Sequence, residues 1–396
     1  MRTRGKTLLG VGSGLLALVL IGAGALAVMN RPLSRAEVDR SIEAQLRAAV
    51  ESDAGLSSAL LTIYSADDDR LMQYAVGSER PGSPEPAGVD SRYHSASVGK
   101  TMLATVYGQL VDEGVVDFDD PAANWLDDGE LAGLFTVDGV DHAAGITLGQ
   151  LLSHTSGVAD YLAGPVVSGP TMLEEIAADP DRIYAPADLL AVSRERQQPI
   201  APPGQAFSYS DTGYVLLGLA LERIEGKPYA QILDDRIFAP LGMSDSEFMT
   251  EFGPGRGILA LDVSGVDLSE RGALSADWAG GGVVTTMHDL LRFTRAFEQG
   301  DLLSAPTRAE LTRFEQEIEP GIRYGKGIMQ FRFSELSPLL FSMSDVRGAV
   351  GATGSFALYD PSSDTYYIAN FGAMGYDQEA IEQLVDARLL VDRLAE

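Results

Sequence analysis

The sequence predicts an α/β (α+β) protein in which one antiparallel sheet, flanked by helices, is built from both ends of the chain body. Strand-like runs separated by turns occur near the start of the body and return near its end. The region between them is rich in helical patterns and long loops. A single sheet from about 31–96 and 285–396, interrupted by a mostly helical region at about 97–284, is the simplest assembly.

The first thirty residues form a separate element. Three basic residues precede an uncharged, apolar stretch, Thr7–Met29. A helix of this length spans about 30 Å, enough to cross the hydrocarbon core of a bilayer. The positive flank would stay in the cytoplasm, so the rest of the chain would be exported.

This segment has two interpretations. Its length favours an uncleaved membrane anchor, whereas Ala25-Leu26-Ala27 has the small-x-small form of a signal-peptidase site. We therefore expect a signal anchor or signal peptide at 1–30 and one domain at 31–396. The domain would be extracytoplasmic, membrane-anchored or secreted, and would contact the membrane only through this helix.

Composition excludes several classes of function. The chain has 29 Lys and Arg against 57 Asp and Glu, for a net charge of −28. Such acidity argues against nucleic-acid binding, which needs clustered positive charge. The absence of cysteine excludes disulfides, thiolate metal sites and a cysteine nucleophile. The four histidines have no metal-ligand spacing, so we expect no metal and no organic cofactor.

The first half of the body opens with a helix and a hairpin. A capping box at Ser34–Glu37 precedes apolar residues at helical spacing. Strand-like runs at 56–64 and 71–77 follow, joined by an acidic turn. A second helical stripe covers 97–113 and ends before Gly114.

The end of the chain returns to strands. Runs at 326–333, 353–359 and 365–371 read as strands, and Asp360-Pro361 begins a turn between the last two. A final helical pattern carries Ile381, Leu384, Val385 and Leu389.

Ser97 and Lys100 form a Ser-x-x-Lys pair at the start of the helical stripe. Residues three apart share a helix face. A serine hydroxyl needs a base to become nucleophilic, and a lysine amine can serve if desolvation lowers its pKa. Gly99-Lys100-Thr101 is not a phosphate loop, because position 94 is His where that motif has glycine. The chain also lacks the Gly-x-Ser-x-Gly elbow of α/β-hydrolases.

Six ordered blocks resemble those of the serine β-lactamase and penicillin-binding-protein-like family, including class C β-lactamases, D-Ala-D-Ala carboxypeptidases and related esterases. The blocks are spread over residues 93–356 in the order and spacing of that family. They are His94–Thr101 (HSASVGKT), Leu151–Gly157 (LLSHTSG), Pro203–Tyr214 (PGQAFSYSDTGY), Pro240–Met243 (PLGM), Ala279–Asp289 (AGGGVVTTMHD) and Gly351–Phe356 (GATGSF).

The resemblance implies an acyl-enzyme mechanism. Ser97 would attack a carbonyl, and Lys100 and Tyr209 would share the proton transfers, with the base left open between them. The backbone N–H groups of Ser97 and Ser355 would form the oxyanion hole. His154 and the glycines at 280–282 are expected to shape the backbone and to take no part in the chemistry.

Two departures from the family pattern affect substrate binding. Asp211 stands where Tyr-x-Asn is usual, and as a carboxylate beside Lys100 it would raise the lysine pKa. Ala352 replaces the Lys or His of the KTG-type triad, leaving Thr353 and Gly354 as its contributions to substrate binding. Arg347 is the sequence's candidate for the missing cation that holds a substrate carboxylate.

Two hypotheses follow from these residues. The leading hypothesis is an exported or membrane-anchored serine hydrolase that acts on ester, amide or β-lactam carbonyls of a small acyl substrate or cell-wall peptide. Because Ala352 removes the usual anion contact, esters and amides are favoured over β-lactams. The alternative, motivated by Asp211 and Ala352, is a catalytically silent domain that binds cell-wall fragments or a protein partner.

Overall fold

The computed structural model describes residues 31–395, and its central element is an eight-stranded antiparallel sheet. The predicted fold class is therefore confirmed. In spatial order the strands are β10 (Gln316–Glu319), β11 (Ile322–Tyr324), β12 (Met329–Phe331), β13 (Val346–Val350), β14 (Phe356–Asp360), β15 (Thr365–Asn370), β1 (Ser58–Ser65) and β2 (Arg70–Gly77).

The two ends of the body meet within this sheet. Strand β1 pairs antiparallel with β2 on one side and with β15 on the other, so that Leu61 lies opposite both Tyr74 and Ala369. All eight residues of β1 are buried, as a strand covered on both faces requires. The N-terminal hairpin thus completes a sheet that the C-terminal strands begin.

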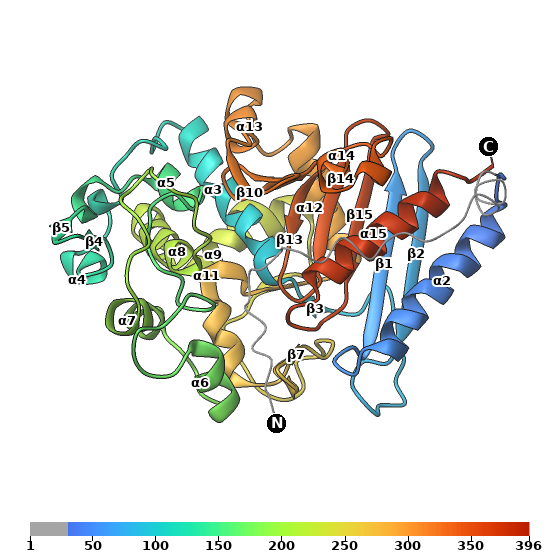
Figure 1. Ribbon diagram of the computed structural model, residues 1–396, viewed down its shortest axis with the longest axis horizontal. Helices are drawn as coiled ribbons and strands as arrows, with labels where there is room; N and C mark the ends of the chain where they lie inside the picture. The colour runs from blue at the N-terminus through green and yellow to red at the C-terminus, as the bar shows by residue number, and fades with distance from the viewer. Residues whose placement is uncertain (1–30, 396) are drawn as a thin grey trace.

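Helices cover both faces of the sheet (Figure 1). Helices α2 (Arg35–Ser52) and α15 (Asp377–Val391) lie side by side over one face and share an apolar core with it. Helix α12 (Met287–Gln299) packs on β14, β15 and β1 from the other face. The capping box predicted for α2 is present, with the Ser34 backbone N–H donating to Glu37 at 2.9 Å.

The helical region stands to one side of the sheet (Figure 1). Its central helix is α3 (Gly99–Asp112), which is preceded by the 3₁₀ turn η2 (Ala96–Val98). The other helices are α4 (Asp128–Leu131), α5 (Leu148–Leu152), α6 (Met172–Ala178), α7 (Pro186–Arg196), α8 (Asp211–Glu225), α9 (Tyr229–Leu233), α10 (Ala239–Leu241) and α11 (Trp278–Gly281). Short helices α13 (Ala305–Leu311) and α14 (Phe333–Leu336) belong to the sheet half.

Three minor sheets complete the described part of the chain. Strands β3 (Tyr93–His94) and β6 (Glu247–Phe248) flank β9 (Val283–Thr285), and β3 leads directly into η2. The other two are the hairpins β4 (Thr136–Val137) with β5 (Val140–Asp141) and β7 (Asp262–Val263) with β8 (Val266–Asp267).

The predicted strand boundaries fail at one edge of the sheet. The run at 326–333 contains only the three-residue β12, and neither β10, β11 nor β13 was predicted. Strands of three to five residues are too short for a period-two pattern to stand out. Residues 353–355 form a turn instead of a strand, because Gly354 has a left-handed φ of 77°.

The predicted apolar segment 7–29 lies outside the described residues. Within 31–395, no helix combines the length and the hydropathy that crossing a bilayer demands.

Candidate active site

Ser97 lies at the junction of the two halves, in the 3₁₀ turn that starts α3. Hydrogen bonds hold Ser95, two residues before it, to two neighbouring segments. The Ser95 N–H (2.8 Å) and hydroxyl (2.9 Å) both donate to the Val283 carbonyl. The Ser355 hydroxyl donates to the Ser95 carbonyl at 2.6 Å. Ala96 is held at φ 48°, a left-handed conformation that costs energy for any residue but glycine. Ser97 is partly exposed while the residues around it are buried.

The turn before Ser97 depends on close packing against α11. A Cβ added to Gly281 would lie 2.4 Å from the Ala96 carbonyl oxygen, and one added to Gly280 would lie 2.8 Å from Asp211 Oδ1. Both positions therefore require glycine. This explains the AGGG block as a packing device, in agreement with the sequence interpretation.

Lys100 is the centre of the polar cluster. Its Nζ lies 2.9 Å from Ser97 Oγ, 2.6 Å from the Gly280 carbonyl and 2.5 Å from Asp211 Oδ1. The residue is only 1% exposed. An ammonium removed from water to this degree needs a counter-charge.

Three carboxylates belong to the cluster that contains this single cation. Asp211 begins α8, and its backbone N–H donates to Asp160 Oδ1 at 3.0 Å. Asp160 also accepts from the backbone N–H groups of Leu162 and Ala163. Asp277 lies beside Gly280 and Gly281, and its charge acts on Lys100. The cluster thus holds an excess of acid in a region with little water.

The imbalance determines the protonation states. Burial, and then the charge of Asp211, raise the pKa of Asp160 to about 7. Burial likewise raises the pKa of Asp277 to about 7. Burial alone would lower the pKa of Lys100, but the charges of Asp211 and Asp277 outweigh it and raise that pKa above its usual value. At neutral pH Lys100 is therefore an ammonium.

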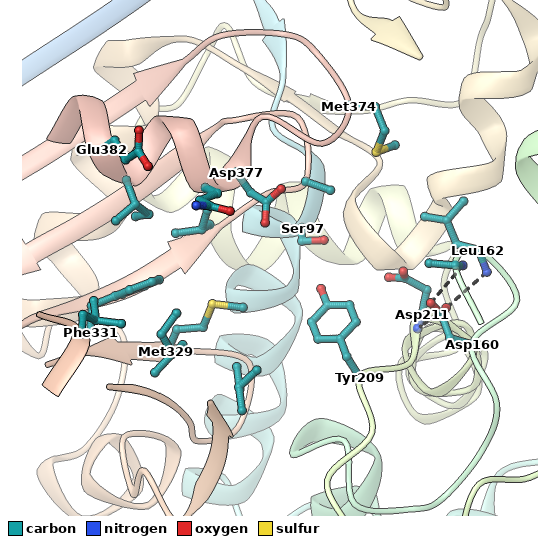
Figure 2. Close-up of a pocket in the computed structure, with 18 residues that line it drawn as sticks. Ser97, Asp160, Leu162, Tyr209, Asp211, Met329, Phe331, Met374, Asp377 and Glu382 are labelled. Carbon is teal, nitrogen blue, oxygen red and sulfur yellow. Dashed lines mark hydrogen bonds between the residues drawn. The ribbon is translucent and has the colours of Figure 1, made fainter. Parts of the chain in front are cut away.

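Tyr209 faces the serine from the other side of Lys100. Figure 2 shows its hydroxyl turned towards Ser97, and Lys100 Nζ is 5.1 Å from its ring centroid. Burial and the charge of Asp211 raise its pKa well above the usual value, against a hydrogen bond with Ser97 that lowers it. The phenol is therefore neutral in the resting site.

His154 fixes the Tyr209 ring and stays uncharged. The two rings stack with centroids 4.2 Å apart. His154 Nδ1 accepts the Ser210 backbone N–H at 3.1 Å, so Nε2 carries the proton and faces the Tyr324 hydroxyl at 3.2 Å. Burial and the charge of Lys100 lower the His154 pKa well below its usual value. Its role is positional, as the sequence analysis expected.

Sequence reasoning missed three polar residues of the site. Asp160 and Asp277 complete the cluster, and His94 lies with Nε2 3.6 Å from Asp277 Oδ2 while its Nδ1 accepts the Ala96 N–H at 3.2 Å. Burial lowers the pKa of His94 to about 4, so it is neutral. Asp160 follows the LLSHTSG block and Asp277 precedes the AGGG block, but nothing in one sequence distinguishes them from other aspartates.

The turn between β13 and β14 brings the KTG-like residues to the serine. The Thr353 carbonyl accepts the N–H groups of Gly372 and Ala373, and the Ala352 carbonyl accepts that of Gly375. Ser355 is fully buried, with its hydroxyl on Ser95. The turn therefore rests directly on the segment that carries Ser97, and the oxyanion hole formed by the N–H groups of Ser97 and Ser355 stays a prediction.

Arg347 is placed elsewhere. Its guanidinium forms a bidentate pair with Glu298 of α12, with Nη2 2.5 Å from Oε2. The Glu298 side chain is 2% exposed, so the pair is part of the packing between sheet and helix. Arg347 does not line the cavity beside Ser97. This placement corrects the expectation that Arg347 replaces the missing substrate-binding cation. Arg347 is not part of the proposed site.

A cavity of about 140 Å³ opens beside Ser97 and Tyr209 (Figure 2). Apolar side chains of β10–β12, together with Ala352 and Met374, form one part of its walls, and α15 contributes mainly polar residues. A second cavity, of about 50 Å³, also touches Ser97 and is lined by His94, Asp277 and Thr353. Within residues 31–395 no set of three or more His, Asp or Glu side chains is arranged to hold a metal ion.

The chain belongs to the Beta-lactamase family, whose model matches residues 42–388. Penicillin-binding protein 4 of Amycolatopsis lactamdurans is 31% identical over 203 residues, covering 51% of this chain and 48% of that protein. The D-alanyl-D-alanine-carboxypeptidase/endopeptidase AmpH of Escherichia coli is 26% identical over 255 residues, covering 63% and 60%. The chain thus spans about half to three-fifths of the length of these curated relatives.

A solved structure agrees over nearly the whole domain. The D-stereospecific amidohydrolase of a Streptomyces species is similar with a TM-score of 0.70 and 27% identity, over 88% of this chain and 98% of that one. The resemblance read from the six blocks is confirmed as family membership.

Proposed function

We propose that this protein is a serine hydrolase that forms an acyl-enzyme at Ser97 from ester, amide or β-lactam carbonyls. One observation carries the proposal: a partly exposed serine at the mouth of an apolar cavity lies 2.9 Å from the amine of a buried lysine. A serine in such contact with a base, at the start of a helix, has the geometry of an activated nucleophile.

The proton movements follow from the contacts of Ser97. As Oγ bonds to the carbonyl carbon, its proton passes to Lys100 or Tyr209, the two groups that hydrogen-bond to it. The same proton then protonates the leaving nitrogen or oxygen as the tetrahedral intermediate collapses. Water, deprotonated by the same group, releases the acyl chain and returns the serine proton.

At neutral pH only a small fraction of Lys100 or Tyr209 is deprotonated and able to act as a base. The pKa values of both Lys100 and Tyr209 are raised. A general base works only when deprotonated, so kcat/KM should rise as pH increases above 7.

Amides and esters are the substrates that fit best. Neither Lys, Arg nor His lines the cavity beside Ser97 within the described chain, and Ala352 stands at the family's cationic position. A substrate carboxylate would find no partner there and would face several aspartates. The D-stereospecific amidohydrolase, which is named for amide hydrolysis, supports the same preference.

Turnover of three substrate types tests the proposal. The body 31–396 and Ser97→Ala are compared on p-nitrophenyl butyrate, nitrocefin and a D-Ala-D-Ala peptide. We expect Ser97-dependent hydrolysis of the ester, with weaker action on the two carboxylate-bearing substrates. Equal rates for the wild type and Ser97→Ala on all three would refute the proposal.

The ion pair between Lys100 and Asp211 supports a second candidate, a silent domain that binds cell-wall fragments or a protein partner. A lysine held as an ammonium cannot accept the serine proton. This candidate predicts saturable muropeptide binding that persists in Ser97→Ala, with no turnover by the wild type at any pH up to 10. Hydrolysis that appears as the pH rises would exclude it.

We further propose that residues 7–29 export the domain, either as an anchor or as a cleaved signal, with no other membrane contact. The relatives named as penicillin-binding proteins support a location outside the cytoplasm. Expression of the full chain followed by fractionation and N-terminal sequencing tests this. A soluble cytoplasmic product with an intact N-terminus would contradict it.

A further inference from the structure

The cavity beside Ser97 combines apolar walls with carboxylates. Of the 18 residues that line it, none within the described chain is Lys, Arg or His, whereas four are acidic. Two of these, Asp160 and Asp211, belong to the Lys100 cluster. The other two, Asp377 and Glu382, lie on α15 at the opposite side of the cavity.

Asp377 is the carboxylate that faces the nucleophile from α15. Figure 2 shows its side chain turned towards Ser97, with Glu382 further along the helix. Asp377 is the first residue of α15, where the backbone N–H groups of a helix favour negative charge. Burial nevertheless raises its pKa, and burial together with the charge of Glu379 raises that of Glu382.

Neither carboxylate is paired with a basic side chain in the part of the chain that the structure describes. Acidic residues elsewhere in this half are paired: Glu298 binds Arg347 and Asp360 binds Arg388. A carboxylate against an apolar wall without a cation is costly. A positively charged group on the ligand would relieve that cost.

The remaining walls specify the rest of the ligand. Ile322, Met329, Phe331 and Ile381 present an apolar surface next to these carboxylates. By the space that one water needs, about 140 Å³ holds roughly ten water-sized groups, the size of an amino-acid derivative.

We propose that this cavity selects acyl donors that carry a free ammonium group and an apolar side chain, such as amides and esters of hydrophobic amino acids, with Asp377 receiving the ammonium. This inference rests on the proposed function and adds a substrate class to it. The acyl carbon lies at Ser97, the apolar side chain lies against β11, β12 and α15, and Glu382 extends the negative wall.

Binding without turnover tests the preference independently of catalysis. Ser97→Ala retains the cavity, and its affinity for 3-phenylpropylamine and 3-phenylpropionate is measured by calorimetry at pH 7.5. We expect the amine to bind at least tenfold more tightly, and Asp377→Asn in the same background to remove most of that difference. Equal affinities, or tighter binding of the carboxylate, would overturn the inference.

Turnover separates this inference from the proposed function. Wild-type enzyme is compared on phenylalaninamide, as either enantiomer, and its N-acetyl derivative, with p-nitrophenyl butyrate as an uncharged reference. We expect kcat/KM for the better free-amine enantiomer to exceed that for its N-acetyl derivative by tenfold or more. Asp377→Asn and Glu382→Gln should lose this ratio.

Glu379→Gln is the matched control, because Glu379 lies on the same helix but is exposed and outside the cavity. It should keep the full ratio. An ester activity that needs Ser97 but shows no amine preference would overturn only this inference. A lack of Ser97-dependent ester turnover would overturn the proposed function, while the calorimetric comparison would still decide the binding claim.

Discussion

The protein contains two deeply buried ion pairs that differ in their charge balance. In the core between the sheet and α15, Arg388 binds Asp360 at 2.6 Å, and both side chains are at most 3% exposed. Beside Ser97, Lys100 binds Asp211 at 2.5 Å with similar burial. The first pair is one cation with one carboxylate, whereas in the second the charge of Asp277 also acts on the cation and Asp160 lies beside Asp211.

The surroundings of the pairs explain the difference. Asp360 accepts hydrogen bonds from Ser344 and Ser362, and Arg388 lies 5.0 Å from the Phe333 ring centroid. These hydrogen bonds and the aromatic ring therefore hold the two side chains in one arrangement. The Lys100 cluster instead has surplus carboxylates whose pKa values rise to about 7. An ion pair with equal numbers of cations and carboxylates stabilises the fold. A cluster with more carboxylates than cations keeps protons near neutral pH, and these are available for proton transfer in catalysis.

Removing Lys100 should produce the largest effect on activity. Lys100→Met takes away the amine within reach of Ser97 Oγ and leaves Asp211 and Asp277 without their cation. We expect Ser97-dependent turnover to fall by about 10³-fold, the middle of the range for acid–base catalysis. Turnover of p-nitrophenyl butyrate measures the loss. A fall of less than tenfold in folded protein would show that Lys100 is not required.

Removing Arg388 should lower the free energy of unfolding and leave turnover unchanged. Arg388→Met leaves Asp360 buried without its cation, which costs about 3–5 kcal/mol of unfolding free energy. Urea denaturation measures this cost. Turnover per folded molecule should match the wild type, and a selective loss of turnover would mean that the two pairs are not separable.

Removing Asp277 should change how stability depends on pH. Its pKa is about 7 in the folded state against an ordinary value of 3.8, so the folded protein keeps a proton that the unfolded chain loses between about pH 4 and 7. The free energy of unfolding therefore falls as pH rises through that window.

Asp277→Asn should remove this contribution. Relative to the wild type, it should gain roughly 2–4 kcal/mol between pH 4.5 and 8, the equivalent of a shift of two to three pKa units. Denaturation at the two pH values measures the difference, with the exposed Asp301→Asn as control. An unchanged difference would refute the proton-storing cluster.

The smallest effect is expected from restoring the family residue at position 211. Asp211→Asn removes the charge that helps to raise the pKa of Lys100. The pH–rate profile for the ester should move to lower pH by about one unit, giving roughly tenfold faster turnover at pH 7. A profile that moves to higher pH would show that Asp211 itself is needed to accept the proton.

The sequence allowed the fold to be predicted where its patterns are long. Strand runs at 56–64 and 365–371, the capping box at Ser34 and the ordered blocks around Ser97 all led to the correct architecture. The short strands β10 and β11 gave no readable pattern, and the predicted run at 326–333 is longer than the three-residue β12 that it contains. The position of β12 depends on pairing with β13, which only the folded sheet supplies.

The site could be predicted in part for a similar reason. Ser97, Lys100, Tyr209 and Asp211 fall within recognisable blocks, and the structure brings them together. Asp160 and Asp277 lie far apart in the chain, so only tertiary packing shows that Asp160 contacts Asp211 and that the charge of Asp277 acts on Lys100. The sequence could not indicate the partner of Arg347 either, because Glu298 lies on a helix far away in the chain.

Covalent labelling of Ser97 tests the central claim most directly. Residues 31–396 are treated with a fluorophosphonate at pH 8, and the intact mass is compared with that of Ser97→Ala. The account predicts one adduct per molecule, localised to Ser97 by peptide mapping, absent from the variant and slower to form at pH 6. Folded wild-type protein that takes up no adduct, or a variant that is labelled equally, would contradict it.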